Sequence, residues 1–164
     1  MKILITGGNS ATALKLVKAF ATYQVILADY GEVPSLTSSA YTLISLGEKN
    51  EDVLAHTLLN KCLDEGVDLI LPIHNFEIEA VVKAETLFNE FNIQVLVPNR
   101  EELDLYFNIA STLKTGDWVI YKSGEVLFAS NSEVIPANNE QKNLNGAFYI
   151  TKDDTAFKLN LITI

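Results

Sequence analysis

The sequence predicts an α/β protein, in which a parallel sheet is covered by helices and is followed by a small antiparallel β appendage. Three observations lead to this prediction. Short apolar runs alternate with amphipathic segments of helical length through the first two thirds of the chain. A glycine turn, Gly7-Gly8, directly follows the first apolar run. After residue 115 the helical segments give way to short strands around turns, which is typical of antiparallel hairpins.

The first part of the chain contains three expected strands and one helix. Residues 2–6 form a short run with an apolar centre at 3–5 and are too few for a helix, so they are expected to form a buried strand. The helix that follows is capped by Ser10 or Asn9, and its apolar residues recur at helical spacing. The next elements are a strand at 25–28, a loop at 30–39 and a strand at 41–46.

Two further helices and two further strands come next, and then a last helix. Asn50 is expected to cap a helix with acidic residues in its first turn, and Gly66 is expected to end it. The remaining elements are a strand at 68–73, a helix from Asn75 to about residue 91, a strand at 93–97, and a helix that starts in a capping box at 99–102 and ends near Ala110 or Leu113.

This order of elements predicts two domains. Residues 1–114 form a Rossmann-like domain of three layers, with the strand order 3-2-1-4-5 and right-handed crossovers. Residues 115–164 form an extension of two hairpins, at 118–128 and 147–162, separated by a polar loop at 131–146. Because two hairpins alone bury little apolar surface, this extension is expected to pack on the first domain.

The composition argues against several classes of function. Twelve basic residues stand against twenty-one acidic ones, and the net charge of −9 repels phosphate backbones and anionic lipids, so neither nucleic-acid nor membrane binding is expected. The single cysteine, Cys62, allows no internal disulfide and fits a cytoplasmic protein. The first apolar run stops at Ile5, too early for a signal peptide, and no run has the length of a membrane span.

The glycine turn is the first candidate ligand site, formed by Gly7, Gly8, Asn9 and Ser10. The second glycine of the dinucleotide-binding fingerprint is missing in either register, which weakens the prediction of a bound pyrophosphate. Backbone N–H groups at the start of the helix could still hold one phosphate or carboxylate. The alternative is a turn that only connects a strand to a helix.

Asp29 is the second candidate, at the end of the second strand and twenty-one residues after Gly8. In dinucleotide-binding enzymes an acid at this place accepts hydrogen bonds from the ribose hydroxyls. The alternative is an acid that makes local bonds to the turn, and the incomplete glycine motif favours that alternative.

The third candidate follows the fourth strand and contains Pro72, His74, Asn75 and Glu77. It lies beside the topological switch point, where ligands bind in sheets of this order. His74 is the candidate ligand contact because imidazole changes its charge near neutral pH, and the alternative is a solvated loop histidine. Asn75 is interpreted as a helix cap, and the helix dipole is sufficient to explain Glu77 in the first turn.

The sequence contains no recognisable catalytic set. It has no Gly-x-Ser-x-Gly elbow, no phosphate loop ending in Gly-Lys-Ser/Thr and no Cys-x-x-Cys. Two histidines and one cysteine offer no metal-binding spacing. No catalytic residue and no metal site are therefore predicted, and no particular cofactor is indicated.

Several of these segments, taken in order, resemble one known domain. The opening turn, Asp29, residues 67–72, residues 77–79 and residues 93–97 resemble the N-terminal preATP-grasp domain of ATP-grasp ligases, the carbamoyl-phosphate-synthase-like group in particular. The resemblance covers roughly residues 1–110. In that family the domain packs against the ATP site of the domains that follow it, and it helps to bind the carboxylate or amino substrate.

The chain departs from that family in two respects. Phe107-Asn108 stands near the place of an Asp-Lys pair that usually precedes the ATP-binding domain. The large domains that carry the nucleotide lysines and the metal carboxylates have no counterpart within these 164 residues. A complete ligase is therefore not expected.

Two functional hypotheses follow. The preferred one is a stand-alone, non-catalytic preATP-grasp-like domain that binds a small anionic metabolite or a protein partner. The alternative is a small NAD(P)-dependent enzyme of the epimerase or reductase type, motivated by Gly7-Gly8 and Asp29. In addition, the exposed edges of the C-terminal hairpins could pair with a second copy of the chain to form a homodimer.

Overall fold

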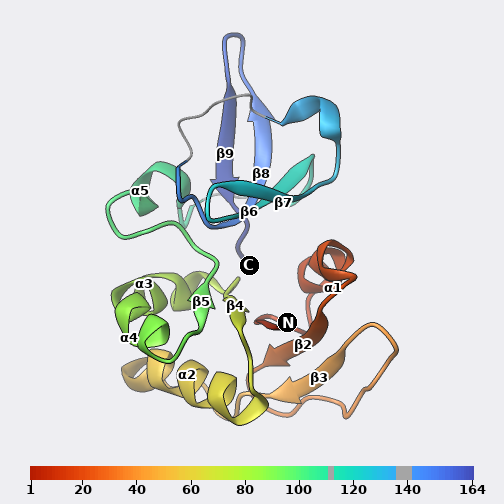
Figure 1. Cartoon of the computed structure of the whole chain (residues 1–164), viewed down its shortest axis with the longest axis vertical. Helices are drawn as coiled ribbons and strands as arrows, with labels where there is room; N and C mark the ends of the chain where they lie inside the picture. Colours follow the sequence, from red (N-terminus) through yellow and green to blue (C-terminus); the bar gives the residue numbers. More distant parts are fainter. Residues whose placement is uncertain (111–112, 136–141) are drawn as a thin grey trace. The chain divides into compact units, whose positions relative to one another are not determined.

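The computed structural model describes residues 1–110, 113–135 and 142–164. It divides the chain into two compact units. The first unit contains Met1–Val95 together with Ile164, and the second contains Leu96–Thr163. Each unit has a sheet of its own, and the two are described separately below (Figure 1).

The first unit is built on a five-stranded parallel sheet with the order β3-β2-β1-β4-β5, and the predicted order 3-2-1-4-5 is therefore confirmed (Figure 1). Every neighbouring pair in this sheet is parallel, so the carboxyl ends of all five strands lie along one edge. The strands are β1 (Lys2–Ile5), β2 (Gln24–Asp29), β3 (Thr42–Ser45), β4 (Leu69–Leu71) and β5 (Gln94–Val95).

Helices cover both faces of this sheet and complete three layers. The single-turn 3-10 helix η1 extends α1, and η2 precedes α2. Helix α1 lies on one face of the sheet, and α2, α3 and α4 lie on the other (Figure 1). None of the described helices is long and apolar enough to cross a membrane. The helices are α1 (Ala11–Val17), η1 (Lys18–Phe20), η2 (Glu51–Val53), α2 (Leu54–Glu65), α3 (Asn75–Lys83) and α4 (Glu85–Glu90).

Local signals in the sequence set most of the helix ends. The Ser10 hydroxyl accepts a hydrogen bond from Ala13 N at 3.0 Å, so the predicted cap of α1 is confirmed. Asn50 likewise accepts from Asp52 N, although the helix opens with the 3-10 turn η2. Gly66 ends α2 in the left-handed conformation, with φ at 63°, as predicted.

Several expected elements are shorter than predicted, among them the strands at 41–46 and 68–73, which are Thr42–Ser45 and Leu69–Leu71. The helix expected at 75–91 breaks at Ala84, whose N–H is shared among the carbonyls of the preceding turn. The sequence did not predict this break, because the apolar stripe of the helix continues through it and no residue type marks it. The fifth strand is only Gln94–Val95. The helix expected after Asn99 is only α5 (Leu103–Tyr106). The predicted hydrogen bonds between Asn99 and Glu102 are present, but they close a turn that precedes the helix. Residues 111 and 112 lie outside the described residues.

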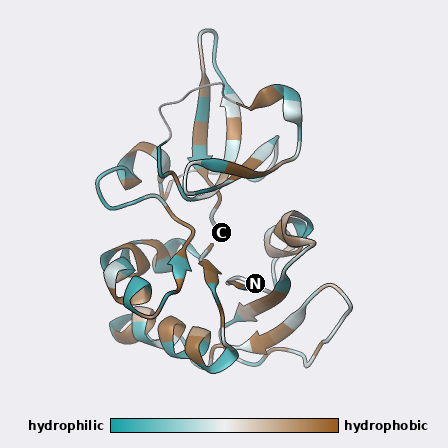
Figure 2. Cartoon of the chain, in the orientation of Figure 1, coloured by the Kyte–Doolittle hydropathy of each residue, from teal (hydrophilic) through white to brown (hydrophobic). Residues whose placement is uncertain are grey.

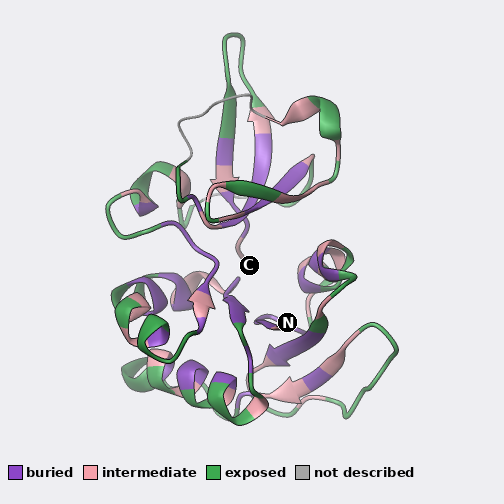
Figure 3. Ribbon diagram, viewed as in Figure 1, coloured by how far each residue is buried: buried purple, intermediate pink, exposed green. Residues whose placement is uncertain are grey.

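The core of the first unit lies around β1, β2 and β4. These strands are buried over almost their whole length (Figure 3), and their residues are mostly apolar (Figure 2). The helices instead alternate apolar and polar residues, and they bury one face each, as with Leu58 and Cys62 of α2. A sheet buried on both faces excludes solvent along the strands, so polar chemistry is concentrated at their ends.

The second unit contains a four-stranded antiparallel sheet with the order β7-β6-β8-β9, so the predicted hairpins are confirmed. Tyr121 and Phe148 are buried in this unit. The loop expected at 131–146 contains one short 3-10 turn, and residues 136–141 of it lie outside the described residues. The elements are β6 (Trp118–Lys122), β7 (Glu125–Ala129), η3 (Ser132–Val134), β8 (Gly146–Lys152) and β9 (Phe157–Leu161).

The buried cysteine of α2 leads to a first prediction. Cys62 is fully buried, and burial raises the pKa of its thiol to about 12, so the reactive thiolate is scarce in the folded protein. We expect no labelling by a chromogenic disulfide reagent at pH 8 in the native state and one equivalent in guanidinium. Cys62→Ser is the control that should remove the second reaction, and rapid labelling of the native protein would contradict the prediction.

Candidate functional site

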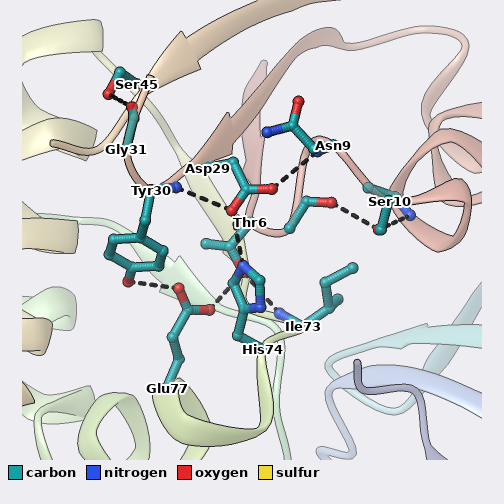
Figure 4. A network of polar contacts seen from close by, with 12 residues as sticks. Thr6, Asn9, Ser10, Asp29, Tyr30, Gly31, Ser45, Ile73, His74 and Glu77 are labelled. Carbon is teal, nitrogen blue, oxygen red and sulfur yellow. Dashed lines mark hydrogen bonds and ion pairs between the residues drawn. The ribbon is translucent and has the colours of Figure 1, made fainter. Parts of the chain in front are cut away.

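The candidate site lies at the carboxyl edge of the parallel sheet. The strand order reverses between β1 and β4, so the segments that follow these two strands leave the sheet in opposite directions at this edge. Figure 4 shows that side chains from the ends of β1 and β2 and from the start of α3 converge there. The predicted site residues therefore come from three segments that are far apart in the sequence.

The centre of the site is a pair formed by Asp29 and His74. His74 Nε2 lies 3.0 Å from Asp29 Oδ1, and the side chains of His74 and Asp29 are only 16% and 13% exposed. Because a carboxylate oxygen accepts hydrogen bonds, Nε2 carries the proton and Nδ1 is the ring nitrogen that is left for another group. Among the described residues, no hydrogen bond to Nδ1 is found.

Backbone groups hold the Asp29 carboxylate in place. Its Oδ2 accepts from Asn9 N at 3.0 Å, and its Oδ1 accepts from Tyr30 N at 2.9 Å as well as from His74. The Asn9 side chain points away from this carboxylate (Figure 4). Asp29 therefore makes the local turn bonds that were expected of a strand-end acid, and it also positions the imidazole.

Glu77 forms a second, deeper group of contacts. Its side chain is fully buried, where its carboxylate accepts from the Thr6 hydroxyl at 2.5 Å and from the Tyr30 hydroxyl at 2.6 Å. Loss of solvation raises the pKa of Glu77, while these two hydrogen bonds and the nearby His74 oppose the rise. The helix dipole is therefore an insufficient explanation for Glu77, because this acid faces the interior.

Tyr30 is a hydrogen-bond donor at every physiological pH. Burial raises the pKa of its phenol, and the neighbouring Glu77 and Asp29 raise it further, since a phenolate would be repelled by both carboxylates. The hydroxyl therefore keeps its proton and donates a hydrogen bond to Glu77. Tyr30 also contacts Asp29 through its backbone, which connects the two groups of contacts.

Aromatic side chains surround the imidazole. The rings of His74 and Phe76 are stacked with their centroids 4.8 Å apart, and Tyr30 lies within 5.7 Å of both rings. The Lys49 amino group lies 3.8 Å from the centre of the Phe76 ring and also pairs with Glu51. This environment supplies flat apolar surface and one cationic group beside the Asp29–His74 pair.

The two glycines are required by close packing. Gly7 has a φ of 67°, and a Cβ on it would lie 2.5 Å from Ile164 Cδ1 and 3.0 Å from Ile73. A Cβ on Gly8 would lie 3.0 Å from the backbone nitrogen of Ala28. The side chain of Ile164 therefore packs directly against Gly7.

The other predicted residues have mainly structural contacts. Ser10 caps α1 and also donates to Gly7 O at 2.7 Å. Pro72 is buried between β4 and α3. The interpretation of Asn75 as a cap is wrong: His74 is the N-cap residue, because its backbone is extended, and Asn75 is the first residue of the helix. Its N–H donates to Ile164 O at 3.0 Å, and among the described residues its buried Oδ1 has no hydrogen-bond partner.

Two residues of the site, Thr6 and Tyr30, were missed by sequence reasoning. Thr6 is a polar residue at the end of a buried apolar strand, which is a signal for a buried hydrogen bond. Glu77 carried a similar signal, because it shares the core-facing side of α3 with Val81 one turn later. Tyr30 carried none, since it follows a strand in a segment that reads as a solvated loop.

A cavity of about 350 Å³ lies at the opposite, amino edge of the same sheet, lined among others by Lys2, Tyr23 and Tyr41. It contains none of the predicted site residues, and its lysine is already used, since Lys2 Nζ donates to Glu65 O. We therefore place the candidate site at the carboxyl edge, where the buried titratable groups are. Within residues 1–110, 113–135 and 142–164, no group of three or more potential metal ligands is found.

Comparison with known proteins adds no functional assignment. No protein-family model matches the chain, and no curated protein matches its sequence. The Rossmann-like topology of the first unit is thus established by its own strand order and not by kinship.

Proposed function

We propose that the carboxyl edge of the parallel sheet binds a small anionic metabolite and that His74 contacts the acidic group of that ligand. The observation that carries the proposal is the Asp29–His74 pair. Because Asp29 engages Nε2, an imidazolium ring at this position has its second N–H, at Nδ1, left to donate to an anion. The location agrees with the proposal, because open α/β sheets bind ligands at the switch point of this edge.

The net charge of the protein makes a local cation necessary. At −9 the chain repels anions at long range, so an anionic ligand needs short-range contacts that outweigh this repulsion. His74 supplies such a contact, and Lys49 places a second cationic group over the Phe76 ring that stacks on His74. The burial of Asp29 and His74 strengthens these contacts relative to those of exposed charges.

We also propose that residues 1–110 correspond to a preATP-grasp domain. The strand order and the positions of Asp29 and Glu77 at the carboxyl edge support the resemblance of the sequence to that family. In such ligases this domain helps to bind a carboxylate or amino substrate, which agrees with an anion at His74. No nucleotide-binding or metal-binding set accompanies it among the described residues, so we propose binding without turnover.

The proposal predicts binding that requires His74 and strengthens in mild acid. We would measure thermal unfolding at pH 6 and pH 8 with succinate, glutamate, inorganic phosphate, ATP and NAD. A ligand at ~100 times its dissociation constant adds about 2.7 kcal/mol, which raises the melting temperature by several degrees. We expect one of the small anions to stabilise the protein at pH 6, less so at pH 8, and not at all in His74→Gln.

His56→Gln is the matched control, because the other histidine is exposed on α2 and is expected to leave binding unchanged. A response to NAD that depends on Asp29 and not on His74 would favour the dinucleotide-dependent enzyme instead. In that case the ribose would have to replace contacts that Asp29 already makes with Asn9, Tyr30 and His74. No response to any of the five compounds would contradict anion binding at this edge.

A further inference from the structure

We propose that Glu77 is a positioning residue of the ligand site: its buried carboxyl group, acting through the hydroxyls of Tyr30 and Thr6, holds Asp29 and His74 in their paired arrangement. The inference rests on the proposed function for the identity of the ligand contact. Its geometry can nevertheless be tested on the protein without ligand. Figure 4 shows the contacts from which it is built.

The first connection runs from Glu77 to Asp29. Glu77 Oε1 accepts from the Tyr30 hydroxyl at 2.6 Å, and Tyr30 N donates to Asp29 Oδ1 at 2.9 Å. The same Oδ1 atom lies 3.0 Å from His74 Nε2. Fixing the Tyr30 ring therefore fixes the backbone group that orients the carboxylate toward the imidazole.

The second connection runs from Glu77 to the backbone that carries His74. Glu77 Oε2 accepts from Thr6 Oγ1 at 2.5 Å, and Thr6 Oγ1 accepts from Ile73 N at 2.8 Å. Glu77 N donates to His74 O at 3.0 Å. These hydrogen bonds, together with the peptide bond between Ile73 and His74, close a ring. Its order is Glu77, Tyr30, Asp29, His74, Ile73, Thr6 and back to Glu77.

Packing alone does not account for an acid at this position. Thr6 and Glu77 are the buried polar side chains of the described chain, and burying a carboxyl group costs free energy that an apolar residue would avoid. The other residues on the same side of α3, Ile78, Val81 and Val82, are apolar. The buried carboxyl group of Glu77 accepts hydrogen bonds from two hydroxyls and is connected through them to Asp29 and His74. Positioning these two residues explains why an acid is buried here.

The expected consequence is a single imidazole tautomer. With Asp29 Oδ1 fixed opposite Nε2, the neutral ring carries its proton on Nε2, and Nδ1 is the nitrogen left to take up the proton that it donates to the anion. If the ring of hydrogen bonds is opened, Asp29 gains freedom and the tautomer with the proton on Nδ1 becomes populated. Loss of packing alone has no reason to change the tautomer.

Nitrogen NMR of the imidazoles in ligand-free protein tests this inference. The chain has two histidines, and the exposed His56 serves as an internal reference for a solvated ring. We would compare wild type with Tyr30→Phe and Thr6→Val, each of which removes one connection, and with Glu77→Gln, which keeps a planar group able to bond both hydroxyls. Val81→Ala, on the same side of α3, is the control for a loss of packing alone.

We expect His74 to show the Nε2-protonated form in wild type, Glu77→Gln and Val81→Ala, and a mixture of tautomers in Tyr30→Phe and Thr6→Val. If Thr6→Val does not fold, Tyr30→Phe decides the question, because Tyr30 is only half-buried. An unchanged His74 spectrum in Tyr30→Phe would overturn the inference. If none of the five compounds raises the melting temperature while the His74 spectra are as expected, only the proposed function is overturned.

Discussion

Replacing Glu77 by alanine is expected to destabilise the parallel-sheet unit by about 3 kcal/mol. The substitution leaves the Thr6 and Tyr30 hydroxyls without their acceptor, and it removes most of a buried side chain. Urea unfolding followed by far-ultraviolet circular dichroism measures the loss. A change of less than about 1 kcal/mol would show that neither hydroxyl depends on this carboxyl group.

Glu77→Gln tests the charge separately from the hydrogen bonds. Because burial raises the pKa of Glu77, the folded protein holds this proton more tightly than the unfolded chain does. The free energy of unfolding therefore falls as pH rises from the ordinary glutamate pKa through the raised one, and this contribution is retained in full only below that window. Glutamine does not titrate, so the variant lacks this fall.

The expected result is a difference that grows with pH. Below the ordinary glutamate pKa, a protonated Glu77 and a glutamine each offer one donor and one acceptor, so the two proteins should have similar stability. As the pH rises above that value, the variant should gain relative to wild type. Since all other groups titrate in both proteins, the difference isolates Glu77. An identical pH dependence in the two proteins would contradict the direction of the pKa shift.

Replacing Gly8 by alanine is expected to cost roughly 2–3 kcal/mol, the effect of overpacking a rigid core. The added Cβ would lie 2.8 Å from Leu43 Cδ1 and 3.0 Å from both Ala28 N and Leu27 Cβ. The leucine methyl can turn away, but the Ala28 nitrogen belongs to β2, where Ala28 pairs with Ile44 of β3. The strands must therefore separate locally.

Gly66→Ala is the matched control for Gly8→Ala. Gly66 has a φ of 63° with nothing within 4 Å of its Cβ position, so alanine there meets left-handed strain without crowding. Such strain costs about 1 kcal/mol or slightly more. Urea unfolding should rank Gly8→Ala as the more destabilised variant. The reverse order would mean that the contact of Gly8 with β2 adapts easily.

The fold was largely predictable because its signals are local. Apolar runs such as residues 2–6 and caps such as Ser10 depend on neighbours within a few residues, and the order of strands and helices leaves few topologies open. The lengths of the later elements were predicted less well. The break at Ala84 and the short α5 depend on backbone hydrogen bonds that residue types do not encode.

The candidate site was predictable only as separate residues. Asp29, His74 and Glu77 were each identified by position, yet each had a structural explanation that was at least as simple. Their meaning changed with their contacts: Asp29 and His74 form a pair, and Glu77 turns inward to two hydroxyls. Tyr30 had no signal in the sequence because its role depends on a residue 47 positions away.

The parallel sheet, its strand order and the edge at which polar residues gather could all be predicted from the amino-acid sequence, because periodicity, glycine turns and crossover handedness act locally or through topology. Which of those polar residues touch depends on how the elements pack. Pairing across 45 positions, as between Asp29 and His74, is decided by strand register and by the direction in which α3 leaves the sheet. Hydrogen bonds between buried groups depend on tenths of an ångström, and only the packed core sets distances on that scale.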